Sequence, residues 1–141
     1  LLLDKGARIN TVPPQGTYGN PLQAAAKEAH VNMVRFLLDR GADVNAVGGK
    51  YGTALQAAIS VGSDALVKTL LDAGAEASIE GGCYGSALQA AATMHGKQYV
   101  QLLLDRDVPV NTNVGKYGNA LAAAAKCANK EAVEILLAHG A

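Results

Sequence analysis

Apolar residues return along the chain at a constant interval of 33 residues. The most regular marks are four leucine pairs and four tyrosine-glycine pairs. They are Leu37-Leu38, Leu70-Leu71, Leu103-Leu104 and Leu136-Leu137, together with Tyr18-Gly19, Tyr51-Gly52, Tyr84-Gly85 and Tyr117-Gly118. A fixed period of this length is typical of proteins built from stacked repeats. The pattern predicts a partial unit at residues 1–17, full units at 18–50, 51–83 and 84–116, and a last unit at 117–141 that lacks its final loop.

Each unit predicts two helices and a loop. In the second full unit, Thr53 is a typical N-cap before an alanine-rich string, so we expect a helix over about residues 54–61. A second helix follows, because Leu66 and Leu70 belong to an apolar stripe at helical spacing, and Gly74 is expected to end it in the left-handed conformation. The polar, glycine-rich stretch from residue 74 to 85 predicts a projecting loop with its tip at Gly81-Gly82.

Helices this short are not stable alone in water, so each unit must bury its apolar stripe against its neighbours. Pairs of alanines on the first helices indicate where adjacent backbones come close together. These pairs are Ala24-Ala25, Ala57-Ala58, Ala90-Ala91 and Ala123-Ala124. We therefore expect a stack in which each unit contacts only the next.

The opening of each first helix carries a recognisable motif. Asn20-Pro21-Leu22-Gln23-Ala24-Ala25 and Thr53-Ala54-Leu55-Gln56-Ala57-Ala58 correspond to Thr-Pro-Leu-His-x-Ala-Ala, and Leu37 to Ala42 follows Leu-Leu-Asp-x-Gly-Ala. With these motifs the chain resembles the ankyrin repeat over essentially its whole length. Its Tyr-Gly-x-Ala-Leu-Gln-Ala-Ala variant is similar to the arrays of large fungal multidomain proteins.

The resemblance implies an all-α repeat solenoid of stacked helix-turn-helix ankyrin repeats with projecting β-hairpin loops. It also implies a scaffold that binds a protein partner through its loop tips and the concave face of its first helices, without catalysis.

Two departures from the family pattern affect the expected packing. The motif's histidine is replaced by Gln23, Gln56 and Gln89, and by Ala122 in the last unit, so we expect a ladder of glutamines to supply the missing hydrogen bonds. The Gly-Ala that closes a unit is Asp107-Val108 in the third full unit. Because aspartate tolerates a left-handed cap less well than glycine, we expect the seam at this point to be the least stable.

Charge and hydropathy exclude two kinds of partner. Twelve basic and twelve acidic side chains cancel, which argues against binding to nucleic acid or to anionic lipid. The longest uninterrupted apolar stretch, Ala120 to Ala125, is far too short to cross a bilayer. No charged leader is visible and the first residue is leucine, so we expect a soluble, intracellular protein cut from a longer chain.

Chemistry-bearing residues do not form a catalytic or metal-binding pattern. His30, His95 and His139 occupy different positions of the repeat, and Cys83 and Cys127 have no histidine near them in sequence. Gly48-Gly49-Lys50-Tyr51 lacks the serine or threonine of a phosphate loop. We therefore expect neither an enzyme nor a cofactor nor a bound metal.

Partner specificity should depend on positions where the units differ. At the loop tips and at the ends of the first helices, these positions are Thr17, Lys50, Cys83 and Lys116, then Lys27, Ser60, Thr93 and Lys126, and beside them Glu28, Val61, Met94 and Cys127. We expect Val61 and Met94 to form an exposed apolar patch flanked by Lys27 and Lys126, the alternative being an unconstrained surface. The four tyrosines, present in every unit, are better explained by packing on one another than by contact with a partner.

A second function remains open on the sequence alone. The chain begins with Leu1-Leu2-Leu3 and closes after Ile135-Leu136-Leu137, and neither end has a polar-faced capping repeat. Stacking of one end on the other would be a heterologous contact, which produces a head-to-tail homo-oligomer, either a ring or a filament. The alternative to a partner-binding scaffold is therefore structural self-assembly.

Overall fold

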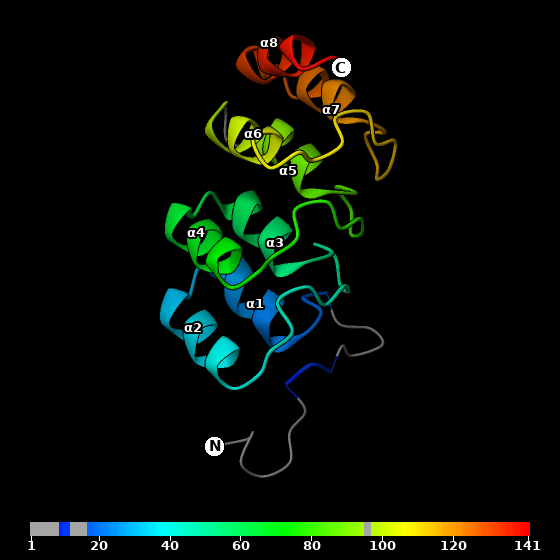
Figure 1. Ribbon diagram of the computed structural model, residues 1–141. Coiled ribbons are helices and arrows are strands. Elements are labelled where there is room, and N and C mark those ends of the chain that lie inside the picture. Colours follow the sequence, from blue (N-terminus) through cyan, green and yellow to red (C-terminus); the bar gives the residue numbers. More distant parts are fainter. Residues whose placement is uncertain (1–8, 12–16, 95–96) are drawn as a thin grey trace.

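The computed structural model describes residues 9–11, 17–94 and 97–141, with Met94 described by its backbone alone. This part of the chain holds eight helices and no strand. They are α1 (Pro21–Lys27), α2 (Val31–Asp39), α3 (Ala54–Val61), α4 (Asp64–Asp72), α5 (Ala87–Met94), α6 (Lys97–Leu104), α7 (Ala120–Lys126) and α8 (Lys130–Ala138). Figure 1 shows them as four helical pairs stacked in one column, with the loops projecting on the side of the first helices. The predicted all-α repeat solenoid is confirmed.

Side-chain caps fix where the first helices begin. The side chains of Asn20, Thr53 and Asn119 each accept a hydrogen bond from the backbone N–H three residues later. Pro21 occupies the first turn of α1, where its missing N–H costs little. The helix predicted at about residues 54–61 is α3, and it begins and ends at those residues.

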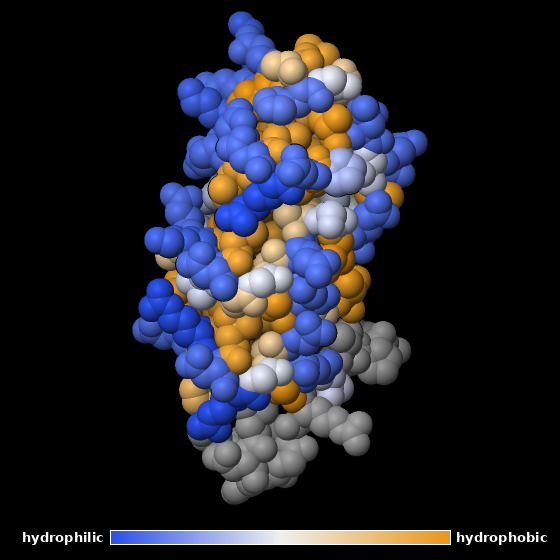
Figure 2. All heavy atoms as spheres, in the orientation of Figure 1, coloured by the Kyte–Doolittle hydropathy of each residue, from blue (hydrophilic) through white to orange (hydrophobic). Residues whose placement is uncertain are grey.

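The core of the stack consists of small residues between the first helices. α1, α3, α5 and α7 pack one on the next, and the side chains of Ala57, Ala58, Ala90 and Ala91 are completely buried there. The second helices cover this layer with larger side chains such as Leu66 and Leu103. Figure 2 shows apolar residues running along the stack between two columns of hydrophilic ones. The predicted role of the alanine pairs is confirmed for these residues.

The loops that connect the units are tighter than a β-hairpin with paired strands. In the described part, each of two loops is closed by a single antiparallel bridge, Gly48 with Gly52 and Gly81 with Gly85. The bridge places the tip of the second loop at residues 82–84, slightly beyond the predicted Gly81-Gly82.

The glycine after each of the first three tyrosines lies close to the backbone of the next loop. Gly85 has a φ of +94°, and a Cβ added there would lie 2.6 Å from the carbonyl carbon of Val114. Any other residue would both strain the backbone and collide with the neighbouring main chain. The Tyr-Gly signature therefore marks a contact between successive loops.

Asparagine side chains fasten most of the units to one another at the ends of the second helices. Asn45 Nδ2 donates to the carbonyl oxygen of Gly74 at 3.2 Å, and Asn45 Oδ1 accepts from the backbone N–H of Glu76 at 2.8 Å. Asn10 makes the same two bonds to the first full unit. Asn111 Nδ2 donates to Gly140.

The seam between the second and third full units, α4 against α6, lacks this fastening. Ser78 stands where other units have asparagine, and in the described part of the chain it bonds to no residue of the next unit. Pro109 stands where Asp43 and Glu76 supply a backbone N–H, so it offers no donor. Asp107 adopts the left-handed conformation at a φ of +58°.

The same seam is open between its second helices. α2 packs on α4 and α6 packs on α8, whereas α4 and α6 make much less contact within the described residues. A cavity of about 400 Å³ lies between them, with an apolar floor that includes Val67, Leu71 and Leu102. The side chain of Tyr99 reaches across this seam and its hydroxyl donates to the carboxylate of Asp64. The prediction placed the least stable seam at the end of the third full unit, where α6 in fact packs on α8 and Asn111 bonds to Gly140. The less closely packed seam lies one unit earlier, because Asp107 faces the unit that precedes it.

We predict that Asp107→Gly stabilises the array by about 0.5–1 kcal/mol, because it relieves the left-handed strain of aspartate at the cost of some chain entropy. Equilibrium urea unfolding measures the change. The matched control is Gly74→Asp, which places aspartate at a φ of +94° in the preceding unit and should lower stability. A loss of stability in Asp107→Gly would contradict our account of the seam.

Candidate binding surface

The four tip positions lie in a single line held by backbone hydrogen bonds. The N–H of Lys50 donates to the carbonyl oxygen of Thr17 at 2.8 Å, that of Cys83 to Lys50 at 2.7 Å, and that of Lys116 to Cys83 at 3.1 Å. The side chains of Thr17, Lys50 and Lys116 are exposed and that of Cys83 is half-buried. The structure thus brings together four residues that are distant in sequence.

Buried glutamines position these tips. The Nε2 of Gln23 donates to the carbonyl oxygens of Ala46 and Gly52 at 2.9 and 2.7 Å, and thereby holds the loop that leads into α3. Gln56 donates in the same way to Ile79 at 3.2 Å. The Nε2 of Gln89 lies 2.9–3.2 Å from three carbonyl oxygens of the last loop. The predicted glutamines do replace the histidine, but each bonds to the following loop and not to another glutamine.

The ends of the first helices supply a second row of side chains. Lys126 and Glu28 are exposed, and Lys27 is half-buried. Thr93 is half-buried and its hydroxyl donates to the carbonyl oxygen of Ala90 at 2.8 Å. Val61 is half-buried, so it is less exposed than we predicted. The side chain of Met94 lies outside the described residues, and the patch of Val61 with Met94 stays a prediction.

Ser60 corrects the predicted surface. Only 8 % of this residue is exposed, and its hydroxyl donates to the carbonyl oxygen of Ala57 at 2.7 Å. The short side chain folds back onto its own helix, while the longer Lys27 and Lys126 at the same repeat position extend outward. We therefore leave Ser60 out of the candidate surface.

The tyrosines after the tips are held partly inside the stack. Tyr51 is 9 % exposed, Tyr84 and Tyr117 are half-buried, and Tyr18 at the first tip is 48 % exposed. Burial raises the pKa of the Tyr84 hydroxyl, and the nearby phenols of Tyr51 and Tyr117 raise it further. Tyr51 belongs to the buried core, and Tyr84 and Tyr117 pack against that core, which agrees with a structural role for these rings.

Lysine side chains lie against these rings. The Nζ atoms of Lys27 and Lys50 are 5.8 and 5.6 Å from the centre of the Tyr51 ring. The Nζ of Lys116 is 5.8 Å from the centre of Tyr84 and 4.7 Å from that of Tyr117. A hydrogen bond with Tyr117 raises the pKa of the Lys116 ammonium group. Sequence reasoning missed the pair of Lys27 with Tyr51, because 24 residues separate them and only the stacking brings them together.

The described residues show no arrangement for metal chemistry. No three side chains of histidine, cysteine, aspartate or glutamate among them could hold a metal ion together. His30 precedes α2 and is exposed, and His139 follows α8 with its Nδ1 2.8 Å from the carbonyl oxygen of Ile135. His95 lies outside the described residues. Cys83 and Cys127 are free thiols. Within the same ranges, none of the helices has the length and apolar character needed to cross a membrane.

Fold and surface together define a class of protein, a solenoid of helical pairs that presents a line of variable side chains on a constant frame. Comparison with known families gives the particular family. The model of ankyrin repeats in three copies matches residues 1–81 and again residues 56–141, so it covers the whole chain. The chain belongs to the ankyrin-repeat family. None of the curated proteins matches it. Ankyrin repeats generally mediate binding between proteins, and the family is typically non-enzymatic.

We predict that Gln89→Ala destabilises the array by about 1–3 kcal/mol, because the substitution removes the donor to the partly buried carbonyl oxygens of Thr112 and Val114. Hydrogen exchange of the last loop, residues 107–118, should accelerate in the same variant. The matched control is Ala122→Gln, which adds the same side chain at the exposed equivalent position of the last unit and should change stability by less than about 0.5 kcal/mol. Equal effects of the two substitutions would show that the bonds of Gln89 do not hold the loop.

Proposed function

We propose that this array is a non-enzymatic scaffold that binds a protein partner along one elongated surface. The surface combines the loop tips with the ends of the first helices. We define this tip surface by the residues Thr17, Lys27, Glu28, Lys50, Val61, Cys83, Thr93, Met94, Lys116 and Lys126.

The observation that carries the proposal is the line of backbone hydrogen bonds from Thr17 to Lys116. Because these bonds are made by the main chain, the side chains at the tips can vary without loss of the frame. Three of the four tip side chains are exposed. Rigid support lowers the entropy lost on binding, and this favours a preformed surface for recognition.

Photo-crosslinking tests this assignment. A partner peptide would first be selected from a random-peptide display library, and a photoreactive amino acid would then replace Lys50 or Lys126 on the tip surface. We expect crosslinks from both positions. The matched controls are Met33 and Arg35, which are exposed on α2. Crosslinks obtained only from the control positions would place the binding site on the second helices and contradict the proposal.

Head-to-tail assembly is the second candidate function, and one described residue favours it. Leu137 on α8 is 54 % exposed at the end of the stack, whereas Leu136 beside it is completely buried. The opposite partner in this contact, Leu1 to Leu3, lies outside the described residues. If the array assembles in this way, its mass measured by light scattering should rise with concentration, and Leu137→Glu should abolish the rise. A constant monomer mass at high concentration would rule this candidate out.

A further inference from the structure

We infer that the segment recognised by the tip surface is acidic, and that Lys27, Lys50 and Lys116 bind its carboxylates. This inference rests on the proposed function, since it names the chemistry of the partner at that same surface. The observation behind this inference is a pair of lysines at one ring, which the packing of the stack does not require. Two ammonium groups, those of Lys27 and Lys50, lie within 6 Å of the centre of one tyrosine ring.

The lysines of the tip surface are not paired with a carboxylate. Lys27, Lys50, Lys116 and Lys126 form no ion pair with any residue that the structure describes. The ring of Tyr51 keeps two like charges near each other, and the rings of Tyr84 and Tyr117 flank a third. Attraction of a cation to the face of a ring orients the ammonium group without cancelling its charge. The three ammonium groups therefore stay available to an anion.

Charge is unevenly distributed over the described surface, although the whole chain is neutral. Near the tip surface, four lysines accompany two glutamates, Glu28 and Glu80. The edge formed by the ends of the second helices carries the opposite charge, with six acidic residues and two arginines. They are Asp39, Asp43, Asp72, Glu76, Asp105 and Asp107, with Arg40 and Arg106.

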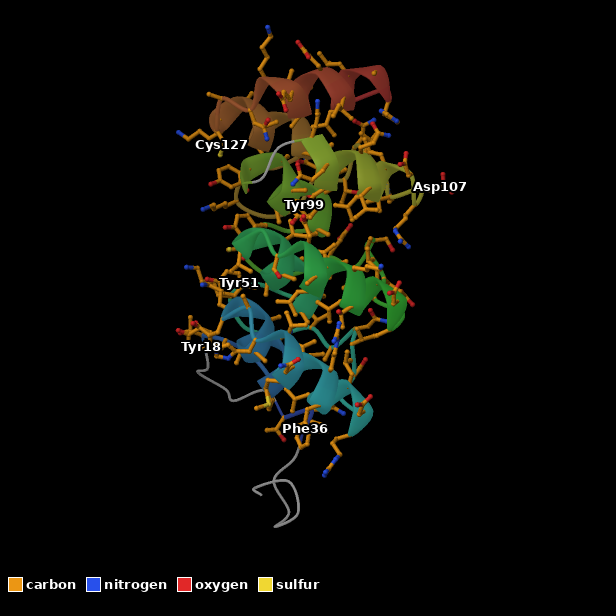
Figure 3. The ribbon with its side chains drawn as sticks, turned by 90° about the vertical axis from the view of Figure 1, so that its left-hand side faces the viewer. Tyr18, Phe36, Tyr51, Tyr99, Asp107 and Cys127 are labelled. Carbon is orange, nitrogen blue, oxygen red and sulfur yellow. The ribbon has the colours of Figure 1, made fainter. Side chains whose placement is uncertain are left out.

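The two edges lie on opposite sides of the stack. Figure 3 shows Tyr18, Tyr51 and Cys127 along one edge and Asp107 at the other. An acidic segment is therefore attracted to the tip surface and repelled from the far edge, which orients it before contact.

The spacing of the cations favours a protein segment over a nucleic acid. Lys50 and Lys116 lie on tips separated by the tip of Cys83, so the surface does not offer a continuous track for phosphates. The half-buried side chains of Tyr84, Tyr117 and Val61 add apolar area to the same tip surface. Carboxylates combined with apolar side chains match a surface that holds both cations and apolar area, and a peptide provides both.

Selection from the random-peptide library, followed by charge reversal, tests the inference. We expect the selected peptides to be enriched in aspartate and glutamate. Their affinity for Lys50→Glu/Lys116→Glu should fall by about tenfold or more at low salt. Raised salt should weaken binding to the unmodified protein, because screening reduces the attraction of exposed charges. Circular dichroism checks that the variant keeps its helices.

The matched control is Lys68→Glu/Lys97→Glu, which makes the same change of charge on the second helices α4 and α6. It should alter the affinity by less than about twofold. Selected peptides without acidic enrichment, or an equal loss in both double variants, would overturn the inference while leaving peptide binding, and with it the proposed function, intact. Absence of any selected peptide would overturn both. Equally tight binding of a single-stranded oligonucleotide at the same salt would show that the cluster takes phosphates and would overturn the choice of an acidic peptide.

Discussion

The hydrogen bond from a buried glutamine amide to the loop that leads into the next helical pair is the interaction on which the rest of the structure depends. Gln23, Gln56 and Gln89 each project from a first helix and donate to backbone carbonyl oxygens of the loop that follows. An unsatisfied buried carbonyl is costly, so the loop is stable only beside its neighbour. The bond therefore converts a set of separate helical pairs into one stack, and it also fixes where the loop tips lie.

One contact between units, that of α4 with α6, departs from the regular repeat. Between α4 and α6 the asparagine bond, the backbone donor and the capping glycine are all replaced, by Ser78, Pro109 and Asp107. In a stack whose units contact only their neighbours, the free energy of separating two units depends on the contact between those two, and strong contacts elsewhere do not change it. Opening at this seam separates two halves that each keep their own contacts.

Most of the fold followed from the 33-residue period and from local signals such as Thr53 before its alanine string, because these depend on interactions within a few residues. The asparagine bonds and the lysine-tyrosine contacts could not be predicted, since each joins residues of different units whose side chains meet only after stacking. Ser60 shows the same limit, because sequence position alone does not tell whether a hydroxyl faces solvent or its own helix. The sequence likewise did not predict that the ammonium groups of Lys27 and Lys50 both lie near the ring of Tyr51.

The backbone bonds that connect successive tips also set a length scale. Neighbouring tips are separated by one backbone hydrogen bond, whose N–H and carbonyl groups are present in every amino acid except proline, which lacks the N–H. A ligand that touches all four tips must therefore match a fixed spacing between them, while the residue at each tip can be substituted independently. Addition or removal of one unit would lengthen or shorten the binding surface by one tip, so the length of that surface is determined by the number of repeat units.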